Sequence, residues 1–475
     1  MKNISQEQIL ERINVENIWW REPFAIPELY SKWTPRPYMK LMSPLIEKKD
    51  VKRTVVLMGP RRVGKTVMIH HVIERLLKKG IAPRNICYLS VDHPIYVGLS
   101  LEEFIKLYQK ATSVDVTKNE CYVFFDEIQY LNDWEKHLKS LTDTYPNVQF
   151  LASGSAAAAL KLKSTESGAG RFTDFLLPPL TFHEYLFLLN KADLVQTEIK
   201  DGETSFETTD IESLNSNFIE YLNYGGYPEV VFSEAIKADP GRFIKNDIID
   251  KVLLRDLPQL YGIRDIQELN FLFTNLAFNT AGEISLNELS KRSGVAKNTI
   301  RKYIEYLEAA FLIKKVLRID HTAKRFKREN YFKIYLTNPS MRAALFSPVS
   351  GDDSSMGALV ETAIFAQWFH AEYLLYYARW KGGEVDIVSV DNKLKPFWAV
   401  EAKWSDRYFD YPEELKPLKL FCNKHNLPHA LVTSRTKKGF KTIGKTNYEF
   451  MPASLYCYQL GYNILEDKAE IVLKS

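Results

Sequence analysis

The stretch Gly59-Pro-Arg-Arg-Val-Gly-Lys-Thr66 decides the fold of this chain. It has the spacing Gly-x4-Gly-Lys-Thr, and it stands between the apolar run 54–58 and the helically spaced apolar residues of 67–77. Glycines let successive backbone N–H groups face an anion at the positive end of the following helix. A strand, a glycine-bearing loop and a helix in this order predict a phosphate-binding loop.

Each residue type in this loop has a part in the predicted nucleotide site. The Lys65 ammonium is expected to reach the outer phosphates, and the Thr66 hydroxyl is expected to ligate Mg²⁺. The predicted nucleotide-binding residues of the loop are Gly59, Pro60, Arg61, Arg62, Val63, Gly64, Lys65 and Thr66.

A second part of the same site follows a later apolar run. Residues 121–125 are apolar and end in Asp126 and Glu127. A carboxylate pair at the end of a buried strand is costly unless a cation lies beside it. We therefore expect Asp126 to hold Mg²⁺ and Glu127 to polarise the attacking water. A further strand, 148–152, leads into Ser153, which either contacts the γ-phosphate and water or serves only the turn.

Composition indicates a globular protein of several domains. The chain has 475 residues, of which 45% are apolar and 26% are charged, and this length exceeds what one core supports. Its four cysteines have no C-x-x-C spacing, so we expect buried thiols in a reducing compartment. The amino terminus is polar and no apolar run approaches about 18 residues, which predicts a cytoplasmic protein without a membrane span.

Positive charge is concentrated in one segment. The net charge is +4, yet residues 291–328 hold twelve Lys or Arg against three acids. Residues 283–307 read as helix, glycine turn and helix, and the apolar residues of the second helix recur at helical spacing. Its outward face carries Lys297, Arg301 and Lys302, which we expect to contact DNA phosphates. The strand-like run 311–317 could be a wing, and a winged helix that contacts only protein is the alternative.

The carboxyl-terminal part carries a second set of chemical groups. Its expected order is helix, three strands, helix and strand, with Glu361 on the first helix, Asp386 on a strand, and Glu401-x-Lys403 after the next. This order resembles the PD-(D/E)XK nucleases. The resemblance implies that Glu361, Asp386 and Glu401 bind one Mg²⁺ and that Lys403 stabilises the attacking hydroxide or the developing charge. A cross-strand salt bridge is the alternative.

These patterns predict an α/β protein with a P-loop parallel sheet, then a helical and winged-helix region, then a small α/β domain. Resemblance to known families implies that the sheet is an AAA-type P-loop parallel sheet and that the small domain is restriction-endonuclease-like. The polar stretch 191–215 is expected to be a loop or mobile insertion. The expected parts are a lead-in that packs on the ATPase core (1–50), the P-loop ATPase (51–190), a helical lid or linker (191–275), a basic winged-helix-like segment (276–335) and the nuclease-like domain (340–475).

Nearly the whole chain resembles bacterial and archaeal AAA-type ATP-binding proteins that end in a domain of unknown function with a nuclease-like core. The motifs that carry the resemblance are Gly59–Thr66, Phe124-Phe-Asp-Glu-Ile-Gln129, Ser153-Gly-Ser155, Gly170-Arg171, Pro179-Leu-Thr-Phe-His-Glu184, Gly225-Gly-Tyr-Pro-Glu229, Arg255-Asp256 and Gly383-Glu-Val-Asp386 with Glu401-Ala-Lys403. The resemblance implies that Gln129 and Arg171 sense the nucleotide, the arginine in cis or from a neighbouring subunit. At Thr337-Asn338-Pro339 the chain lacks the acid expected in the family, so no function is carried over to that turn.

The leading functional hypothesis is an ATPase that acts on nucleic acid, with ATP turnover gating a Mg²⁺-dependent nuclease-like domain. One alternative is an ATP-dependent switch whose nuclease-like domain is inactive and only binds DNA or protein. Another is a signalling ATPase that contacts proteins through the winged helix. ATP, Mg²⁺ and DNA are the expected ligands, no membrane contact is expected, and a homo-oligomer is left open.

Overall fold

The chain forms two compact units in the computed structural model, which describes residues 5–47, 52–155, 170–200, 203–324, 330–369, 374–391 and 393–474. The first unit comprises Met1–Pro178 and Leu465–Ser475, and the second comprises Pro179–Ile464. No helix among the described residues is both long and apolar enough to cross a membrane.

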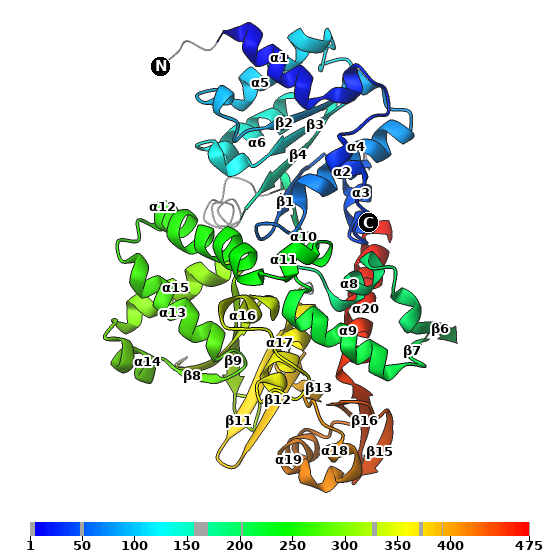
Figure 1. The fold of residues 1–475 in the computed structure, drawn as a ribbon, viewed down its shortest axis with the longest axis vertical. Coiled ribbons are helices and arrows are strands. Elements are labelled where there is room, and N and C mark those ends of the chain that lie inside the picture. Colours follow the sequence, from blue (N-terminus) through cyan, green and yellow to red (C-terminus); the bar gives the residue numbers. More distant parts are fainter. Residues whose placement is uncertain are drawn as a thin grey trace. The chain divides into compact units, whose positions relative to one another are not determined.

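The first unit is built on a parallel sheet (Figure 1). Within the described residues this sheet has five strands in the order β2-β3-β4-β1-β5. Their bounds are β1 (Thr54–Met58), β2 (Ile86–Ser90), β3 (Cys121–Asp126), β4 (Val148–Gly154) and β5 (Phe172–Leu176). The predicted strands β1 to β4 and the predicted parallel sheet are confirmed, whereas β5 was not predicted from the sequence.

Helices cover both faces of this sheet, because its central strands are apolar on both sides. In Figure 1, α1, α5 and α6 lie on one side and α2, α3 and α4 on the other. Their bounds are α1 (Gln6–Glu16), α2 (Glu28–Ser31), α3 (Met39–Glu47), α4 (Lys65–Lys78), α5 (Leu101–Thr112) and α6 (Trp134–Thr144). The amino-terminal lead-in packs on the sheet, since the Asn17 side chain exchanges hydrogen bonds of 2.9 and 2.7 Å with the Tyr88 backbone in β2.

The second unit contains a mixed sheet that runs through most of its length. In the described part of the chain it has nine strands in the order β15-β16-β14-β13-β12-β11-β9-β10-β8. Their bounds are β8 (Glu283–Ser285), β9 (Ile313–Ile319), β10 (Tyr331–Leu336), β11 (Leu375–Trp380), β12 (Gly383–Val390), β13 (Pro396–Glu401), β14 (His429–Ser434), β15 (Gly439–Ile443) and β16 (Thr446–Pro452). The sheet is continuous because β9 pairs in parallel with β11. The segments predicted as separate parts, 276–335 and 340–475, therefore share one sheet, and β9 is paired on both sides and is not a free wing.

The helices of the second unit surround this sheet. They are α8 (Phe182–Leu188), α9 (Ile211–Tyr224), α10 (Pro228–Val231), α11 (Glu234–Lys237), α12 (Leu257–Tyr261), α13 (Ile266–Phe278), α14 (Leu286–Ser293), α15 (Lys297–Ala309), α16 (Ser340–Leu345), α17 (Met356–Trp368), α18 (Arg407–Asp410), α19 (Lys416–His425) and the first part of α20 (Ala453–Lys474), which enters the first unit at Leu465, with π-helical turns over Gly241–Asp250 and Val252–Asp256. The predicted order of helix, three strands, helix and strand is confirmed by α17, β11 to β13, α19 and β14.

The polar stretch 191–215 differs from its prediction as a loop. It contains a hairpin of β6 (Gln196–Lys200) and β7 (Glu203–Glu207), followed by the start of α9. Phe206 of β7 is buried, and its carbonyl accepts a 2.8 Å hydrogen bond from Lys438 Nζ. The hairpin is therefore anchored by contacts that are distant in the sequence, which local polarity does not reveal.

Candidate functional site

The predicted phosphate-binding loop joins β1 to α4 in the first unit. Gly59 follows β1, and a Cβ atom there would lie 2.1 Å from the Leu177 carbonyl oxygen. Gly64 precedes the first turn of α4 and has φ 92°, a conformation that L-residues with side chains rarely adopt. Both glycines are therefore required by the backbone path.

The loop lysine lies at the start of α4. Lys65 is buried, and its ammonium donates hydrogen bonds to the carbonyl oxygens of Gly59 at 3.1 Å and Pro60 at 2.8 Å. These two acceptors are neutral dipoles, and the charge of the lysine also acts on the nearby Glu127 carboxyl group. The positive end of the helix adds to that charge, and the arrangement suits an anionic ligand.

Three strands and the loop bring polar oxygens together around Asp126. At the end of β3, Asp126 Oδ2 accepts hydrogen bonds from the Thr66 hydroxyl at 2.7 Å and the Tyr88 hydroxyl at 2.8 Å. Its other oxygen accepts from the Ser153 hydroxyl at the end of β4. Hydroxyl and carboxylate oxygens are the ligands that Mg²⁺ prefers, so Thr66 and Asp126 fit the predicted role.

Glu127 occupies a left-handed backbone position directly after β3, with φ 58°. Its backbone N–H donates to Asp126 Oδ1 at 3.2 Å, and its carboxylate accepts from the Gln129 side chain. Burial raises the pKa of Glu127, while the Lys65 charge opposes that rise. Gln129 in turn accepts from the Ser155 backbone N–H at 3.1 Å. The structure thus connects Glu127, Gln129 and the end of β4 by hydrogen bonds.

Arg171 does not lie with these residues. Its carbonyl accepts the backbone N–H of Thr54 at 2.9 Å, which places it beside the first residue of β1, whereas the loop follows the last. At about 3.3 Å per residue, the strand between them spans roughly 16 Å. Its guanidinium pairs with Asp143 at 3.0 Å. The expectation that Arg171 contacts the γ-phosphate in cis is therefore wrong, because Arg171 lies at the amino-terminal ends of the strands and the loop lies at their carboxyl-terminal ends.

A buried arginine that no motif indicated supports the loop. Arg36 Nη1 donates to the carbonyl oxygens of Val63 at 2.9 Å and Pro178 at 3.0 Å. It joins the amino-terminal lead-in to the loop backbone. No local pattern could have identified it, because its acceptors are backbone groups distant in the sequence.

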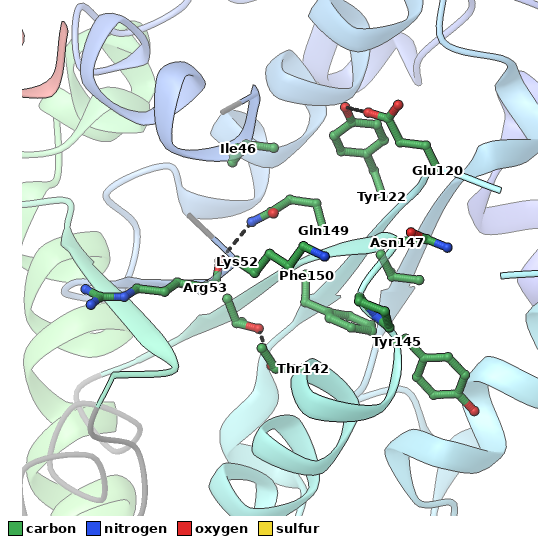
Figure 2. A pocket seen from close by; sticks show the side chains of 13 residues that line it. Ile46, Lys52, Arg53, Glu120, Tyr122, Thr142, Tyr145, Asn147, Gln149 and Phe150 are labelled. Atoms are coloured by element: carbon green, nitrogen blue, oxygen red, sulfur yellow. Dashed lines mark hydrogen bonds between the residues drawn. The ribbon is translucent and has the colours of Figure 1, made fainter. Parts of the chain in front are cut away.

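A cavity of about 210 Å³ lies at the amino-terminal edge of the same sheet, away from the loop (Figure 2). Four of its polar side chains pair with one another: the Thr54 and Thr142 hydroxyls lie 2.7 Å apart, and Tyr122 donates to Glu120 at 2.7 Å. It is lined by Ile46, Lys52, Arg53, Thr54, Glu120, Tyr122, Thr142, Tyr145, Pro146, Asn147, Val148, Gln149 and Phe150. None of the predicted site residues lines this cavity.

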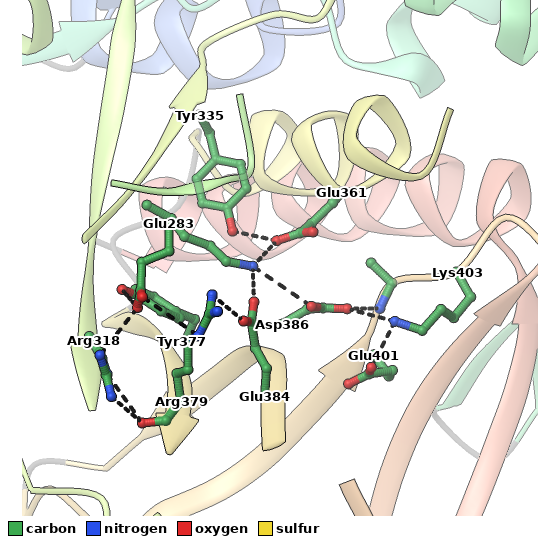
Figure 3. A network of polar contacts seen from close by, with 12 residues as sticks. Glu283, Arg318, Tyr335, Glu361, Tyr377, Arg379, Glu384, Asp386, Glu401 and Lys403 are labelled. Carbon is green, nitrogen blue, oxygen red and sulfur yellow. Dashed lines mark hydrogen bonds and ion pairs between the residues drawn. The ribbon is translucent and has the colours of Figure 1, made fainter. Parts of the chain in front are cut away.

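The second unit holds a cluster of buried charges, here named the carboxylate–lysine centre (Figure 3). It consists of Lys333 on β10, Glu361 on α17, Glu384 and Asp386 on β12, Glu401 at the end of β13, and Lys403 just beyond it. α17 is buried on nearly all sides, so it carries Glu361 into an apolar interior. The predicted acids thus lie in one region of the unit.

Side chains alternate between the two faces of a strand, so Glu401 and Lys403 are predicted to lie on the same face, and the structure places them together. Lys403 Nζ lies 2.7 Å from Glu401 Oε1 and 3.3 Å from Asp386 Oδ2. The same Asp386 oxygen accepts the Ala402 backbone N–H at 2.9 Å. The structure therefore brings Asp386, Glu401 and Lys403 together as predicted from their order.

The lysine on β10 was not predicted to belong here. Lys333 Nζ lies 2.8 Å from Glu361 Oε1, 2.6 Å from Glu384 Oε1 and 3.7 Å from Asp386 Oδ1. Glu361 Oε1 also accepts the Tyr335 hydroxyl at 2.6 Å. The Lys333 side chain is 3% exposed, against 25% for Lys403. Sequence reasoning missed it because β10 precedes the recognised helix–strand pattern.

Burial and the crowding of like charges raise the pKa values of two carboxyl groups in this centre. Burial, with the Asp386 charge, raises the pKa of Glu361 to about 7 and that of Glu401 to about 8. Burial alone would lower the pKa of Lys333, but the surrounding carboxylates raise it above its usual value. Both lysines of the centre are therefore protonated at neutral pH.

The predicted metal site does not fit this arrangement. Among the residues that the structure describes, no three His, Cys, Asp or Glu side chains form a group that could hold a metal ion. The oxygens of Glu361 and Asp386 instead accept hydrogen bonds or ion pairs from Lys333, Tyr335 and Lys403. Two ammonium groups thus stand where one shared cation was expected.

The predicted basic face lies on α15. Lys297, Arg301 and Lys302 are exposed. The opposite face is buried, as predicted, through Ile300, Tyr303, Ile304 and Leu307. α14 begins at the predicted cap Ser285, whose hydroxyl accepts the Glu288 backbone N–H at 3.3 Å. This geometry presents the three cations to solvent.

Comparisons with known proteins identify two domains. Residues 51–186 match the family described as "AAA domain", and residues 215–353 match "Domain of unknown function (DUF8612)". An uncharacterized protein of Haemophilus influenzae is 26% identical over 73% of this chain and 81% of its own length. Two uncharacterized proteins of Methanocaldococcus jannaschii are 26% and 25% identical, each over 70% of this chain and over 71% and 70% of their own lengths. Residues 51–186, most of which lie in the first unit, are therefore similar to an AAA domain.

Two solved structures of a yeast protein are also similar. They are an S. cerevisiae Hsp104-ADP complex, with TM-score 0.30 and 12% identity, and an S. cerevisiae Hsp104:casein complex, with TM-score 0.31 and 13% identity. The matches cover 59% and 64% of this chain, and 39% and 54% of the yeast chains. Scores this low carry no argument about this protein.

Proposed function

We propose that the first unit binds and hydrolyses ATP with Mg²⁺. The observation that carries the proposal is the meeting of Lys65, Thr66 and Asp126 at one end of the parallel sheet. Lys65 holds the outer phosphates, and Thr66 and Asp126 hold Mg²⁺. The ion, when bound, neutralises charge on the phosphates.

Glu127 serves as the base that orients and polarises the attacking water. It directly follows the Mg²⁺-binding Asp126, and burial raises its pKa toward the range in which a carboxylate is an effective base. Gln129 fixes its carboxylate by donating a hydrogen bond. Ser153 holds Asp126 in place from the end of β4.

Hydrolysis of ATP by the full-length protein tests this assignment. Glu127→Gln should keep ATP binding and reduce hydrolysis by about 100-fold or more, because the amide cannot accept a proton. Glu120→Gln is the matched control, since Glu120 stands just before the other end of the same strand. A Glu127→Gln variant that hydrolyses ATP at the parent rate would contradict the role of Glu127.

The second unit engages nucleic acid, and ATP turnover controls that engagement. Support comes from the exposed cations Lys297, Arg301 and Lys302 on α15. The order α13, β8, α14, α15, β9, β10 is also that of a winged helix. Binding has more support than cleavage, because both lysines of the carboxylate–lysine centre are paired with acids.

Cleavage is a second candidate, favoured by Lys403 beside Asp386 and Glu401. Plasmid DNA incubated with the full chain and Mg²⁺, with and without ATP, separates the two. Nicked or linear DNA that disappears with Lys403→Ala would establish cleavage. Shifted but uncut DNA supports binding, and no shift under either condition contradicts a role in nucleic-acid binding.

A further inference from the structure

The position of Lys333 has a consequence for the chemistry of the second unit. Its ammonium has three N–H donors, and carboxylates from α17 and β12 lie at 2.6, 2.8 and 3.7 Å from it. Figure 3 shows Glu361, Glu384 and Asp386 directed toward one another from these elements. Without a cation between them, buried carboxylates this close would repel one another.

A divalent ion in the same place would need oxygens that already accept from Lys333, Tyr335 and Lys403. Mg²⁺ takes about six oxygens at about 2.1 Å in near-octahedral geometry. Here Glu361 Oε1 accepts from both Lys333 and Tyr335, and Asp386 Oδ2 accepts from Lys403 and a backbone N–H. The centre is organised for ammonium donors.

We propose that Lys333 is the resident cation of the carboxylate–lysine centre and replaces the divalent metal ion that the Asp386 and Glu401-x-Lys403 pattern predicts. Lys333 comes from β10, outside the helix–strand unit that carries the other groups. The pairing of β9 with β11 joins β10 to that unit and so brings the positive charge of Lys333 to the centre. The centre therefore assembles without metal and excludes it. This inference concerns the second unit alone and does not depend on ATP hydrolysis by the first.

Manganese binding to the full-length, nucleotide-free protein tests the inference. Mn²⁺ is counted by electron paramagnetic resonance in the wild type and in Asp386→Asn, Lys333→Met and Lys314→Met variants. The wild type and Asp386→Asn should bind the same number of Mn²⁺ ions, because no Mn²⁺ binds at Asp386. Lys333→Met, which vacates the position, should gain one Mn²⁺ site that the wild type lacks. Lys314→Met, an exposed position on β9, should behave as the wild type.

Each outcome decides the question. A wild-type Mn²⁺ site that Asp386→Asn abolishes would overturn the proposal, as would a folded Lys333→Met protein that gains no Mn²⁺. A Lys333→Met protein that folds only with Mn²⁺ would support it, because the ion then replaces the ammonium. If this variant fails to fold under both conditions, the comparison of wild type with Asp386→Asn decides by itself whether a metal site is present.

Discussion

Each unit of the molecule buries a lysine within a polar site, but the two lysines have different hydrogen-bond partners. Lys65 in the first unit donates to two backbone carbonyl oxygens. Lys333 in the second unit lies among three carboxylates. The two hydrogen-bond acceptors of Lys65 are dipoles and its charge also acts on the Glu127 carboxyl group, whereas three carboxylates lie within 3.7 Å of the Lys333 ammonium.

This difference teaches that the partners of a buried lysine, more than its burial, decide what the site can bind. Carbonyl dipoles hold an ammonium in place without an ion pair, and a phosphate that reaches the ammonium gains charge-assisted hydrogen bonds. Carboxylates supply full opposite charges, and removing either partner leaves a buried charge unpaired. The first arrangement is expected to bind an anion, and the second is expected to hold the protein together.

The largest expected effect is on the stability of the second unit. Lys333→Met should lower its free energy of unfolding by about 3–5 kcal/mol in metal-free buffer, because the buried Glu361 loses its ion-pair partner and Asp386 and Glu384 lose one of theirs. Lys314→Met, on the exposed side of the neighbouring strand, should change it by no more than about 0.5 kcal/mol. Denaturant unfolding measures both. Equal free energies of unfolding for the two variants would contradict the claim that the Lys333 charge stabilises the second unit.

Stability should also depend on pH through Glu361 and Glu401. Their folded-state pKa values, about 7 and about 8, lie above the ordinary value of 4.5, so protons favour the folded state. Their contribution is complete below pH 4.5 and is lost as pH rises through 7 and 8, at up to about 1.4 kcal/mol per pH unit for each proton.

Unfolding midpoints of the second unit between pH 5 and 8 check this dependence. Glu401→Gln, whose amide does not titrate, should reduce the decrease of the unfolding midpoint with rising pH. Glu413→Gln, at an exposed turn, should leave that decrease unchanged. A flat profile for the wild type would contradict the account, because it would show that these carboxyl groups are already ionised in the folded protein over this range.

The smallest effect concerns the exposed face of α15. Replacing Lys297, Arg301 and Lys302 with Ala should weaken DNA binding. The slope of the logarithm of the binding constant against the logarithm of the salt concentration should become shallower by roughly 0.9 for each lost phosphate contact. Replacing Lys416 and Lys424, exposed on α19, is the control. DNA binding measured at several salt concentrations gives the slope. If the slope does not change, α15 belongs to a protein contact.

The first unit could be predicted far better than the sheet of the second. β1 to β4 are consecutive apolar runs, whereas β5 has only Phe175 fully buried and carries Asp174 outward, so its pattern is weak. The joining of β9 to β11 could not be predicted, because register between distant strands depends on tertiary packing.

The candidate sites show the same limit. Lys65, Asp126 and Glu127 were identified because short spacings place them at loop and strand ends. Lys333 and Arg36 were missed because their partners lie on other elements, with no motif in between. Local spacing identifies groups that one turn or one strand brings together, and the fold supplies the rest.

The most direct test of the account is ATP binding to the full chain in the presence of Mg²⁺, measured by titration calorimetry. Lys65→Ala should weaken binding by at least about 100-fold, because it removes the full positive charge beside the phosphates. Lys78→Ala, exposed on the same helix, and Lys333→Met should each bind within about twofold of the wild type. Unchanged ATP affinity in Lys65→Ala would contradict the claim that this lysine is held ready for an anion.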